Sequence, residues 1–197
     1  MPNWCENTVT LKHKDSAMIQ RAYDAFGRNE FLNEFIPVPQ DLVDTISGSY
    51  ADKEKQREHR EKENQNLIKY GYSNWYNFCV SEWGTKWDIG GDSECSSLLD
   101  DNTLHLSFDS AWSPPLDAYS KLLEMGFEIE AYYYEGGGAF CGKWDNGEWD
   151  SYDIPSTSQE VYQMVPSDID AMFNITGNML MWEEEDKEEE EDKVFGK

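Results

Sequence analysis

Residues 104–126, with the sequence LHLSFDSAWSPPLDAYSKLLEMG, combine the pattern of one β-strand with that of one α-helix. The first six residues alternate between apolar and polar, as expected for a strand with one buried face. Pro114 and Pro115 follow where a helix can begin without losing a hydrogen bond, and Ser113 is in position to cap it. Gly126 is a typical helix stop. The stretch therefore predicts a strand that leads directly into a helix.

The residues that follow predict a further strand and a hairpin. Residues 127–134 alternate so that Glu128 and Glu130 face away from the buried side chains. The three glycines at 136–138 break this strand, and we interpret them as a turn or bulge. Asn146 and Gly147 are a strong signal for a tight hairpin turn.

The residues before the opening stretch are rich in aromatic side chains. Residues 72–88 read YSNWYNFCVSEWGTKWD, and aromatic residues at this density usually pack in a core, with a sugar-binding or base-stacking platform as the alternative. Residues 85–89 alternate and predict a strand, which a loop over 90–102 would connect to the strand at Leu104. We also predict that Trp112 is a core or hinge anchor that joins that strand to its helix.

The N-terminal part repeats the order of strand and helix. Residues 7–12 alternate as a strand, and the following helix is capped by Asp15 or Ser16 and ends near Gly27. Residues 31–39 contain two prolines and predict an irregular connection. Residues 51–70 interleave six basic with five acidic residues, which indicates a solvent-exposed helix inserted into the domain.

The predicted order is that of a ferredoxin-like domain. The fold class is α+β, a split β-α-β-β-α-β antiparallel sheet with helices on one face, a charged helical insertion and an acidic disordered tail. We expect the domain to cover residues 1–155, with the insertion at about 51–80. Residues 156–182 would form a peripheral helical extension, and residues 183–197 a disordered tail without an apolar residue before Val194.

Four short runs resemble a known family. They are Met1–Asn7, Trp83–Asp88, Ser110–Pro115 and the glycine turn before Phe140. Together they resemble the YubB-type family of phage and plasmid proteins over about residues 1–150. The resemblance implies a ferredoxin-like domain encoded by an accessory gene of a mobile element, and it implies no established reaction.

Charge restricts the classes of partner. The formal net charge is −24, of which the last fifteen residues carry −6, so the folded part is itself acidic. Such a surface repels phosphate backbones and anionic lipid, and we expect no direct contact with nucleic acid or membrane. No apolar run is long enough for a membrane helix, which favours a soluble, cytoplasmic protein, and the resemblance implies that the cell is a bacterial host. The four cysteines stand singly and predict neither a disulfide framework nor a metal site, and we expect no cofactor.

These features favour a non-enzymatic accessory protein that binds a basic surface of a host protein, for example as a nucleic-acid mimic or as an inhibitor of a host system. No catalytic motif is present, so an enzyme is the less favoured reading. The alternatives are a small-molecule or nucleotide-binding enzyme of unknown reaction, and a nucleic-acid-binding module that uses the exposed sheet face. The predicted contact residues on that face are Asp88, Asp109, Glu128, Glu130, Tyr132 and Tyr134. The oligomeric state stays open.

Overall fold

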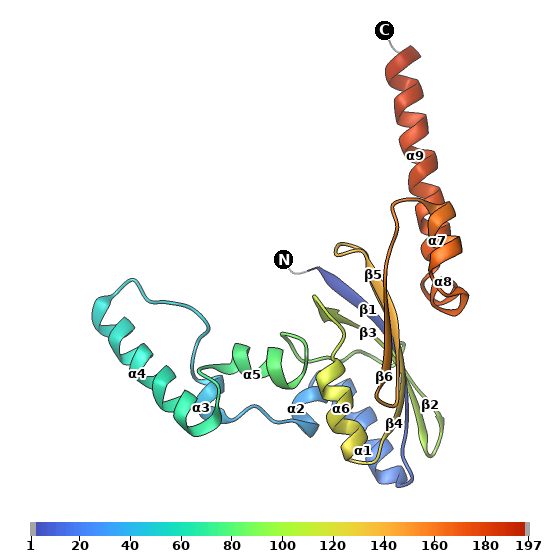
Figure 1. Cartoon of the computed structure of the whole chain (residues 1–197). Coiled ribbons are helices and arrows are strands. Elements are labelled where there is room, and N and C mark those ends of the chain that lie inside the picture. The colour runs from blue at the N-terminus through green and yellow to red at the C-terminus, as the bar shows by residue number, and fades with distance from the viewer. Residues whose placement is uncertain (1–2, 196–197) are drawn as a thin grey trace.

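The computed structural model describes residues 3–195, with side chains to Lys187, and shows a six-stranded antiparallel sheet with helices on both faces (Figure 1). The strands are β1 (Trp4–Lys12), β2 (Ser96–Asp100), β3 (Thr103–Ala111), β4 (Glu128–Glu135), β5 (Phe140–Asp145) and β6 (Glu148–Asp153). The helices are α1 (Ser16–Gly27), α2 (Phe31–Phe35), α3 (Gln40–Val43), α4 (Lys53–Tyr70), α5 (Trp75–Glu82), α6 (Leu116–Glu124), α7 (Ser158–Met164), α8 (Ser167–Phe173) and α9 (Ile175–Phe195).

The sheet order is β2-β3-β1-β4-β5-β6. Strand β1 is central and pairs antiparallel with β3 and β4, so that Val9 lies between Leu106 and Ala131. The elements β1, α1, β2, β3, α6 and β4 follow the order of the split β-α-β-β-α-β fold, which confirms the predicted fold class. The hairpin of β5 and β6 extends the sheet beyond β4.

The main core lies between the sheet and the helices α1 and α6. Alternate residues of β1, β3 and β4 face these helices, as their period of two requires. Helix α1 contributes Ile19 and Phe26, and α6 contributes Tyr119 and Leu122, all at most 1% exposed. Asp15 caps α1 by accepting the Ala17 N–H at 2.9 Å, as the sequence predicted.

The opposite sheet face, called here the second face, is partly covered by α7, α8 and α9. Tyr134 and Cys141 on this face pack with Val161, Ile169 and Ile175 from those helices. Helices therefore lie on both faces, whereas we predicted helices on one face alone. The residues of the predicted extension supply an apolar stripe that the sheet buries.

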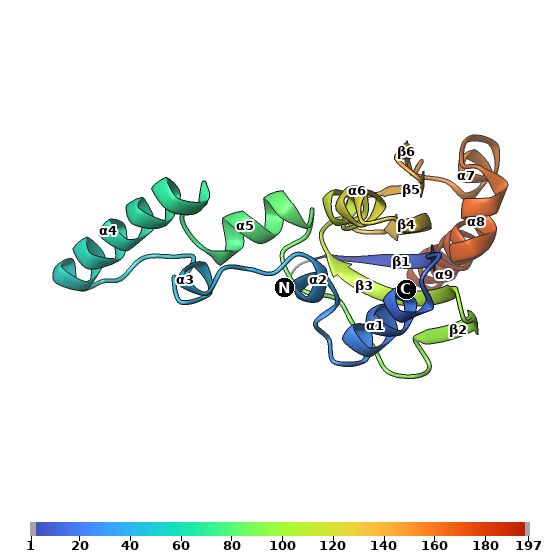
Figure 2. The same cartoon turned by 90° about the horizontal axis from the view of Figure 1, so that it is seen from below.

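The insertion forms an arm made of α3, α4 and α5, which projects from the sheet in Figure 2. The exposed helix predicted over residues 51–70 is confirmed as α4. Asn66 of α4 is 4% exposed and donates hydrogen bonds to Thr45 Oγ1 at 2.9 Å and to the Ser73 carbonyl at 3.1 Å. A few polar contacts of this kind hold the arm together.

Residues 85–89 do not form a strand, which corrects the prediction, and β2 lies further on at Ser96–Asp100. The loop is fixed by side-chain hydrogen bonds: Thr85 Oγ1 donates to the Ala111 carbonyl at 3.0 Å, and Trp83 Nε1 donates to the Ile36 carbonyl at 3.0 Å. Side-chain hydrogen bonds to the neighbouring backbone, rather than strand pairing, therefore hold this loop.

Two further local predictions were wrong. Residues 31–35, expected to be irregular, form the short helix α2. The side chains of Phe31, Leu32 and Phe35 in this helix are buried. Ser113 does not cap α6, which begins at Leu116 after Pro115; its hydroxyl instead donates to the Gly84 carbonyl at 2.6 Å.

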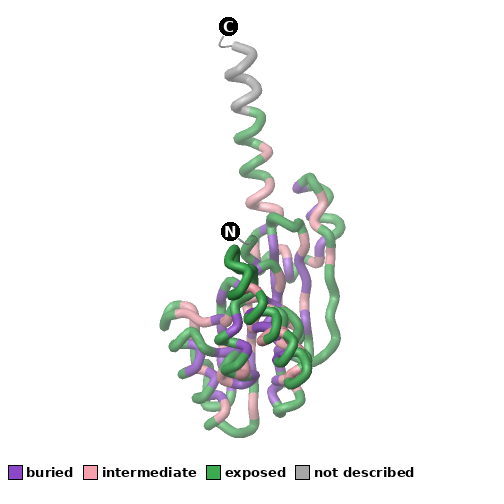
Figure 3. The backbone as a smooth tube through the Cα atoms, turned by 90° about the vertical axis from the view of Figure 1, so that its left-hand side faces the viewer, coloured by how far each residue is buried: buried purple, intermediate pink, exposed green. Residues whose placement is uncertain are grey.

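Helix α9 continues through the acidic residues to Phe195, where we expected a disordered tail from Glu183 onward. It projects away from the sheet in Figure 1, and Figure 3 shows its described part as mostly exposed while buried residues gather in the sheet. Glutamate is a good helix former, so a helix that is already docked can propagate without further burial. Among the described residues, no helix is long and apolar enough to cross a membrane.

Candidate functional site

Five of the six predicted contact residues lie on the second face, as their alternation required, and four of the five are not buried there. Asp109 of β3 pairs with Glu6 of β1, while Glu128 and Glu130 of β4 pair with Lys12 and Thr10. Tyr132 lies beside them, paired with Thr8. The structure thus brings these side chains onto one surface.

Two of these side chains already have partners within the chain. Glu130 forms an ion pair with Lys143, whose Nζ donates to Glu130 Oε1 at 2.7 Å. This contact holds the pKa of Glu130 below its ordinary value. Lys143 Nζ also lies 4.8 Å from the centre of the Tyr132 ring. Lys143 therefore compensates the charge of Glu130 and also lies against the ring of Tyr132.

Tyr134 and Asp88 are not surface contacts of the sheet, which corrects their predicted placement. Tyr134 is 8% exposed and its ring stacks on Phe173 of α8 at 5.8 Å. Asp88 lies in the loop before β2, where its carboxylate accepts the N–H groups of Leu32 at 2.6 Å and of Asn33 at 3.0 Å. Burial raises the pKa of Asp88, and these hydrogen bonds oppose the rise. Asp88 therefore holds the first turn of α2.

An open cleft of about 690 Å³ lies at the end of the second face. We call it the acidic cleft. Its walls are formed by the start of β1, the end of β3, the loop before β2, and α8. The residues used below are Trp4, Glu6, Trp87 and Asp109, with Met172 and Phe173 on the α8 side.

Glu6 and Asp109 give the acidic cleft its charge. They face each other across the pair of β1 and β3, and neither takes part in an ion pair or side-chain hydrogen bond among the residues that the structure describes. Partial burial raises the pKa of Glu6, and the neighbouring Asp109 charge raises it further. Two adjacent like charges destabilise the pair. A bound cation would relieve this repulsion.

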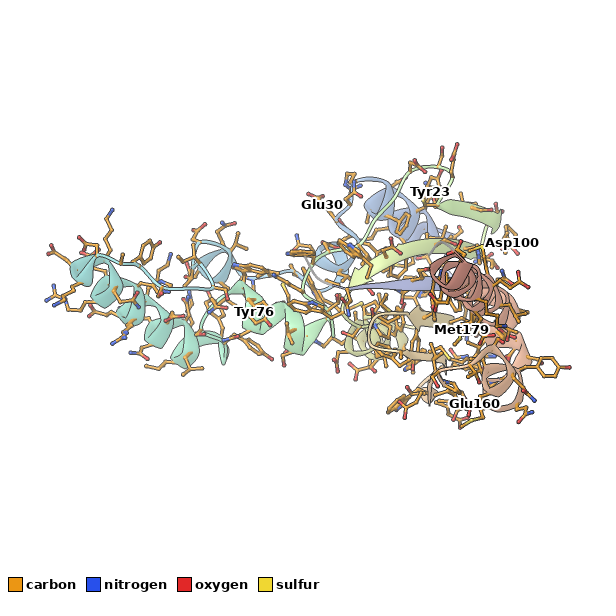
Figure 4. The ribbon with its side chains drawn as sticks, turned by 90° about the horizontal axis from the view of Figure 1, so that it is seen from above. Tyr23, Glu30, Tyr76, Asp100, Glu160 and Met179 are labelled. Atoms are coloured by element: carbon orange, nitrogen blue, oxygen red, sulfur yellow. The ribbon has the colours of Figure 1, made fainter. Side chains whose placement is uncertain are left out.

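Exposed aromatic rings border these carboxylates. Trp4 and Trp87 are 48% and 37% exposed, and their ring centres lie 5.7 Å apart. Lys86 Nζ lies 4.6 Å from the centre of the Trp87 ring, 5.1 Å from that of Trp112 and 5.9 Å from that of Tyr76. One of the chain's own cations thus lies near the rings of Trp87, Trp112 and Tyr76, of which Tyr76 is labelled in Figure 4.

Trp112 is 41% exposed, so its prediction as a core anchor was wrong. Its backbone has a φ of +69°, a conformation that bulky residues rarely adopt. The Trp112 N–H donates to the Asn3 carbonyl at 3.0 Å, which ties the start of the chain to the end of β3. The backbone is therefore held so that the ring points toward Lys86 rather than into the core.

Sequence reasoning missed Glu6, Trp4 and Trp87 as a group. Their runs are 80 residues apart in the chain and meet only because β1 pairs with β3 and the loop packs beside both. The resemblance of the runs Met1–Asn7, Trp83–Asp88 and Ser110–Pro115 to one family was the available signal, since all three border this cleft. Among the described residues, no cluster of three His, Cys, Asp or Glu side chains could hold a metal ion.

Comparison with known proteins gives a family and one structural likeness. The model of the family described as "Ferredoxin-like domain in Api92-like protein" matches residues 82–195, more than half of the chain. The chain is also similar to the crystal structure of protein api92 from Yersinia pseudotuberculosis, with 14% identity and a TM-score of 0.40. That likeness covers 79% of this chain and 99% of the other. No curated protein matches the chain.

Proposed function

The chain belongs to the family of the ferredoxin-like domain in Api92-like proteins, and we propose that its function is to bind a cationic segment of a partner protein in the acidic cleft. The observation that carries this proposal is the pair of uncompensated carboxylates, Glu6 and Asp109, beside the exposed rings of Trp4 and Trp87. The proposal keeps the basic partner and the contact Asp109 expected from the sequence, and it replaces the predicted contacts on β4 with Glu6 and the neighbouring tryptophans.

Carboxylates and aromatic rings recognise arginine and lysine together. A cation on an aromatic face contributes about 0.5 kcal/mol at exposed sites and about 2 kcal/mol when water is excluded. An exposed ion pair adds at most about 1 kcal/mol. Each contact alone is weak, so a segment with two closely spaced cations would use the cleft best.

The acidic surface supports a protein partner over nucleic acid. The chain carries −24, and the cleft presents carboxylates where a nucleic-acid backbone would bring phosphates. A cationic segment of a protein would instead be attracted to these carboxylates, because complementary charge favours association. Occupation of a surface that normally binds nucleic acid is one form that such binding would take.

We further propose that the chain is an accessory protein of a phage or plasmid and acts in the cytoplasm of a bacterial host. The resemblance of Met1–Asn7 and Trp83–Asp88 to the YubB-type family supports this origin. The same resemblance carries no reaction, which agrees with a binding role.

A labelled arginine-rich peptide and a glutamate-rich peptide of equal length test the proposal by fluorescence anisotropy. We expect the arginine-rich peptide to bind and the glutamate-rich peptide not to bind. The double variant Glu6→Gln/Asp109→Asn should lower the affinity for the arginine-rich peptide at least tenfold, which corresponds to about 1.4 kcal/mol. The control Glu128→Gln/Glu130→Gln removes the same charge from the same face and should leave affinity within about twofold.

Equal losses in the two double variants would show a nonspecific effect of net charge and would refute the cleft as the site. Tighter binding of a labelled single-stranded oligonucleotide than of the arginine-rich peptide would instead favour the nucleic-acid-binding alternative. Far-ultraviolet circular dichroism of each variant confirms that the proteins compared are folded.

A further inference from the structure

Helix α4 of the arm is the helix of this acidic chain in which basic side chains outnumber acidic ones. Helix α4 has six of the 16 lysines and arginines of the chain, against four glutamates. Lys53, Arg57 and Arg60 follow each other at spacings of four and three, which places them on one stripe of the helix. All three are exposed and take part in no ion pair among the described residues.

These three side chains border a hollow of about 320 Å³ together with Tyr50 and Gln56. The hollow lies at the outer end of the arm, where nitrogen-tipped side chains project from α4 (Figure 4). Glu54, Glu58 and Glu61 alternate with these cations along α4, but none of them forms an ion pair with Lys53, Arg57 or Arg60 among the described residues.

The arm also exposes apolar side chains that its own small core does not cover. Leu67 and Ile68 at the end of α4 are 53% and 88% exposed, and Val43 of α3 is 50% exposed. Single exposed apolar residues are common, but a projecting element that combines them with unpaired cations has the composition of an interaction surface.

We propose that the occupant of the acidic cleft is a second copy of this chain, whose Arg57 and Arg60 enter the cleft so that two copies exchange arms in a closed dimer. This inference rests on the proposed function and names its partner. The two arginines, three residues apart on one helix, match the two carboxylates and the exposed ring of Trp4 in the cleft.

The geometry favours a contact between copies. The arm projects away from the sheet in Figures 1 and 2, so the far end of α4 is remote from the cleft of its own chain. In a two-fold dimer each copy gives its arm and receives one, and the contact forms twice without leaving a free site.

Charge reversal on the two sides gives a decisive test. The arm variant Arg57→Glu/Arg60→Glu has an acidic arm and an acidic cleft, while the cleft variant Glu6→Lys/Asp109→Lys has a basic arm and a basic cleft. Each variant alone should be monomeric by analytical ultracentrifugation at about 100 µM and 0.1 M salt, because both of its contacts repel. An equimolar mixture should form a dimer, since both contacts are then attractive.

The unmodified chain should sediment as a dimer, and Lys12→Glu/Lys14→Glu, which reverses two cations outside the arm, should leave its dissociation constant within about twofold. A monomeric unmodified chain, or a mixture of the two variants that stays monomeric, would overturn the inference. If that monomer still binds the arginine-rich peptide through Glu6 and Asp109, the proposed function stands and only the identity of the partner fails. If the chain binds neither a second copy nor the arginine-rich peptide, both the proposed function and this inference fail.

Discussion

Gly142 of β5 shows how a single residue limits the packing of the sheet. A Cβ atom at this position would lie 2.3 Å from the Asp150 carbonyl and 2.3 Å from the Tyr133 hydroxyl. One neighbour is backbone and cannot move without breaking the pairing of β5 with β6. Glycine is therefore required here by space rather than by backbone conformation.

We predict that Gly142→Ala destabilises the protein by about 1–3 kcal/mol, the range for overpacking a filled interior. Gly27 is the matched control, because a Cβ atom there meets nothing within 4 Å. Gly27→Ala at the end of α1 should be neutral or stabilising by about 0.5–1 kcal/mol. Urea denaturation measures both, and an unchanged stability of Gly142→Ala would show that β5 can separate from β6 at low cost.

Glu6 connects protonation to binding, since burial and then Asp109 raise its pKa above the ordinary value. Protonation removes a negative charge from the cleft, so affinity for the arginine-rich peptide should fall as pH is lowered through this raised pKa. The loss should begin at a higher pH than for an ordinary glutamate. Peptide titrations between about pH 7 and pH 4 at constant ionic strength measure it.

The sign for stability is opposite to that for binding. A raised pKa means that the folded chain binds the proton more tightly than the unfolded chain, so the contribution of Glu6 to stability falls as pH rises above its unfolded pKa. Glu6→Gln should remove this slope and flatten the binding profile. A binding profile that is the same in Glu6→Gln would assign the titration to another group.

At the scale of the elements, the carboxylate of Glu183 joins α9 to the start of α7. Glu183 accepts the Ser158 N–H at 2.7 Å and the Ser158 hydroxyl at 2.9 Å, at the start of α7. These bonds hold the pKa of Glu183 below its ordinary value. The following residues Glu184–Lys187 are exposed and make no such contact with the domain.

Two truncations that differ by one residue test this junction. A chain that ends after Glu183 should keep the melting temperature of the full chain. A chain that ends after Trp182 should melt at a lower temperature, because the first turn of α7 then loses its acceptor. Differential scanning calorimetry compares them. Identical melting temperatures would show that solvent replaces Glu183, and a large loss in both would show that the rest of α9 docks on the domain.

At the scale of the whole molecule, the net charge of −24 opposes compaction. Salt shortens the distance over which this repulsion acts, from about 30 Å at 0.01 M to about 10 Å at 0.1 M. We predict that the melting temperature rises over this range while the affinity for the arginine-rich peptide falls, because repulsion within the chain and attraction to the peptide are screened alike. A melting temperature that does not change with salt would show that the acidic charges are already spaced beyond mutual influence.

The sequence by itself determined the order of elements in the split sheet. The alternation in residues 104–109 and 127–134, the cap at Asp15 and the charged run of residues 51–70 are local patterns. They were confirmed as β3, β4, α1 and α4, because side-chain period and helix capping depend on near neighbours in the chain.

Only the tertiary structure decided where the candidate site lies. Alternation placed Asp109 on the second face, but the pairing of Glu6 with Asp109 depends on the register of two strands about a hundred residues apart. The burial of Tyr134 depends on Phe173, and the role of Asp88 depends on the backbone of α2. Strand register and helix docking are determined by contacts between segments that are distant in the chain. A period of two or 3.6 in the sequence does not specify which distant segments make those contacts.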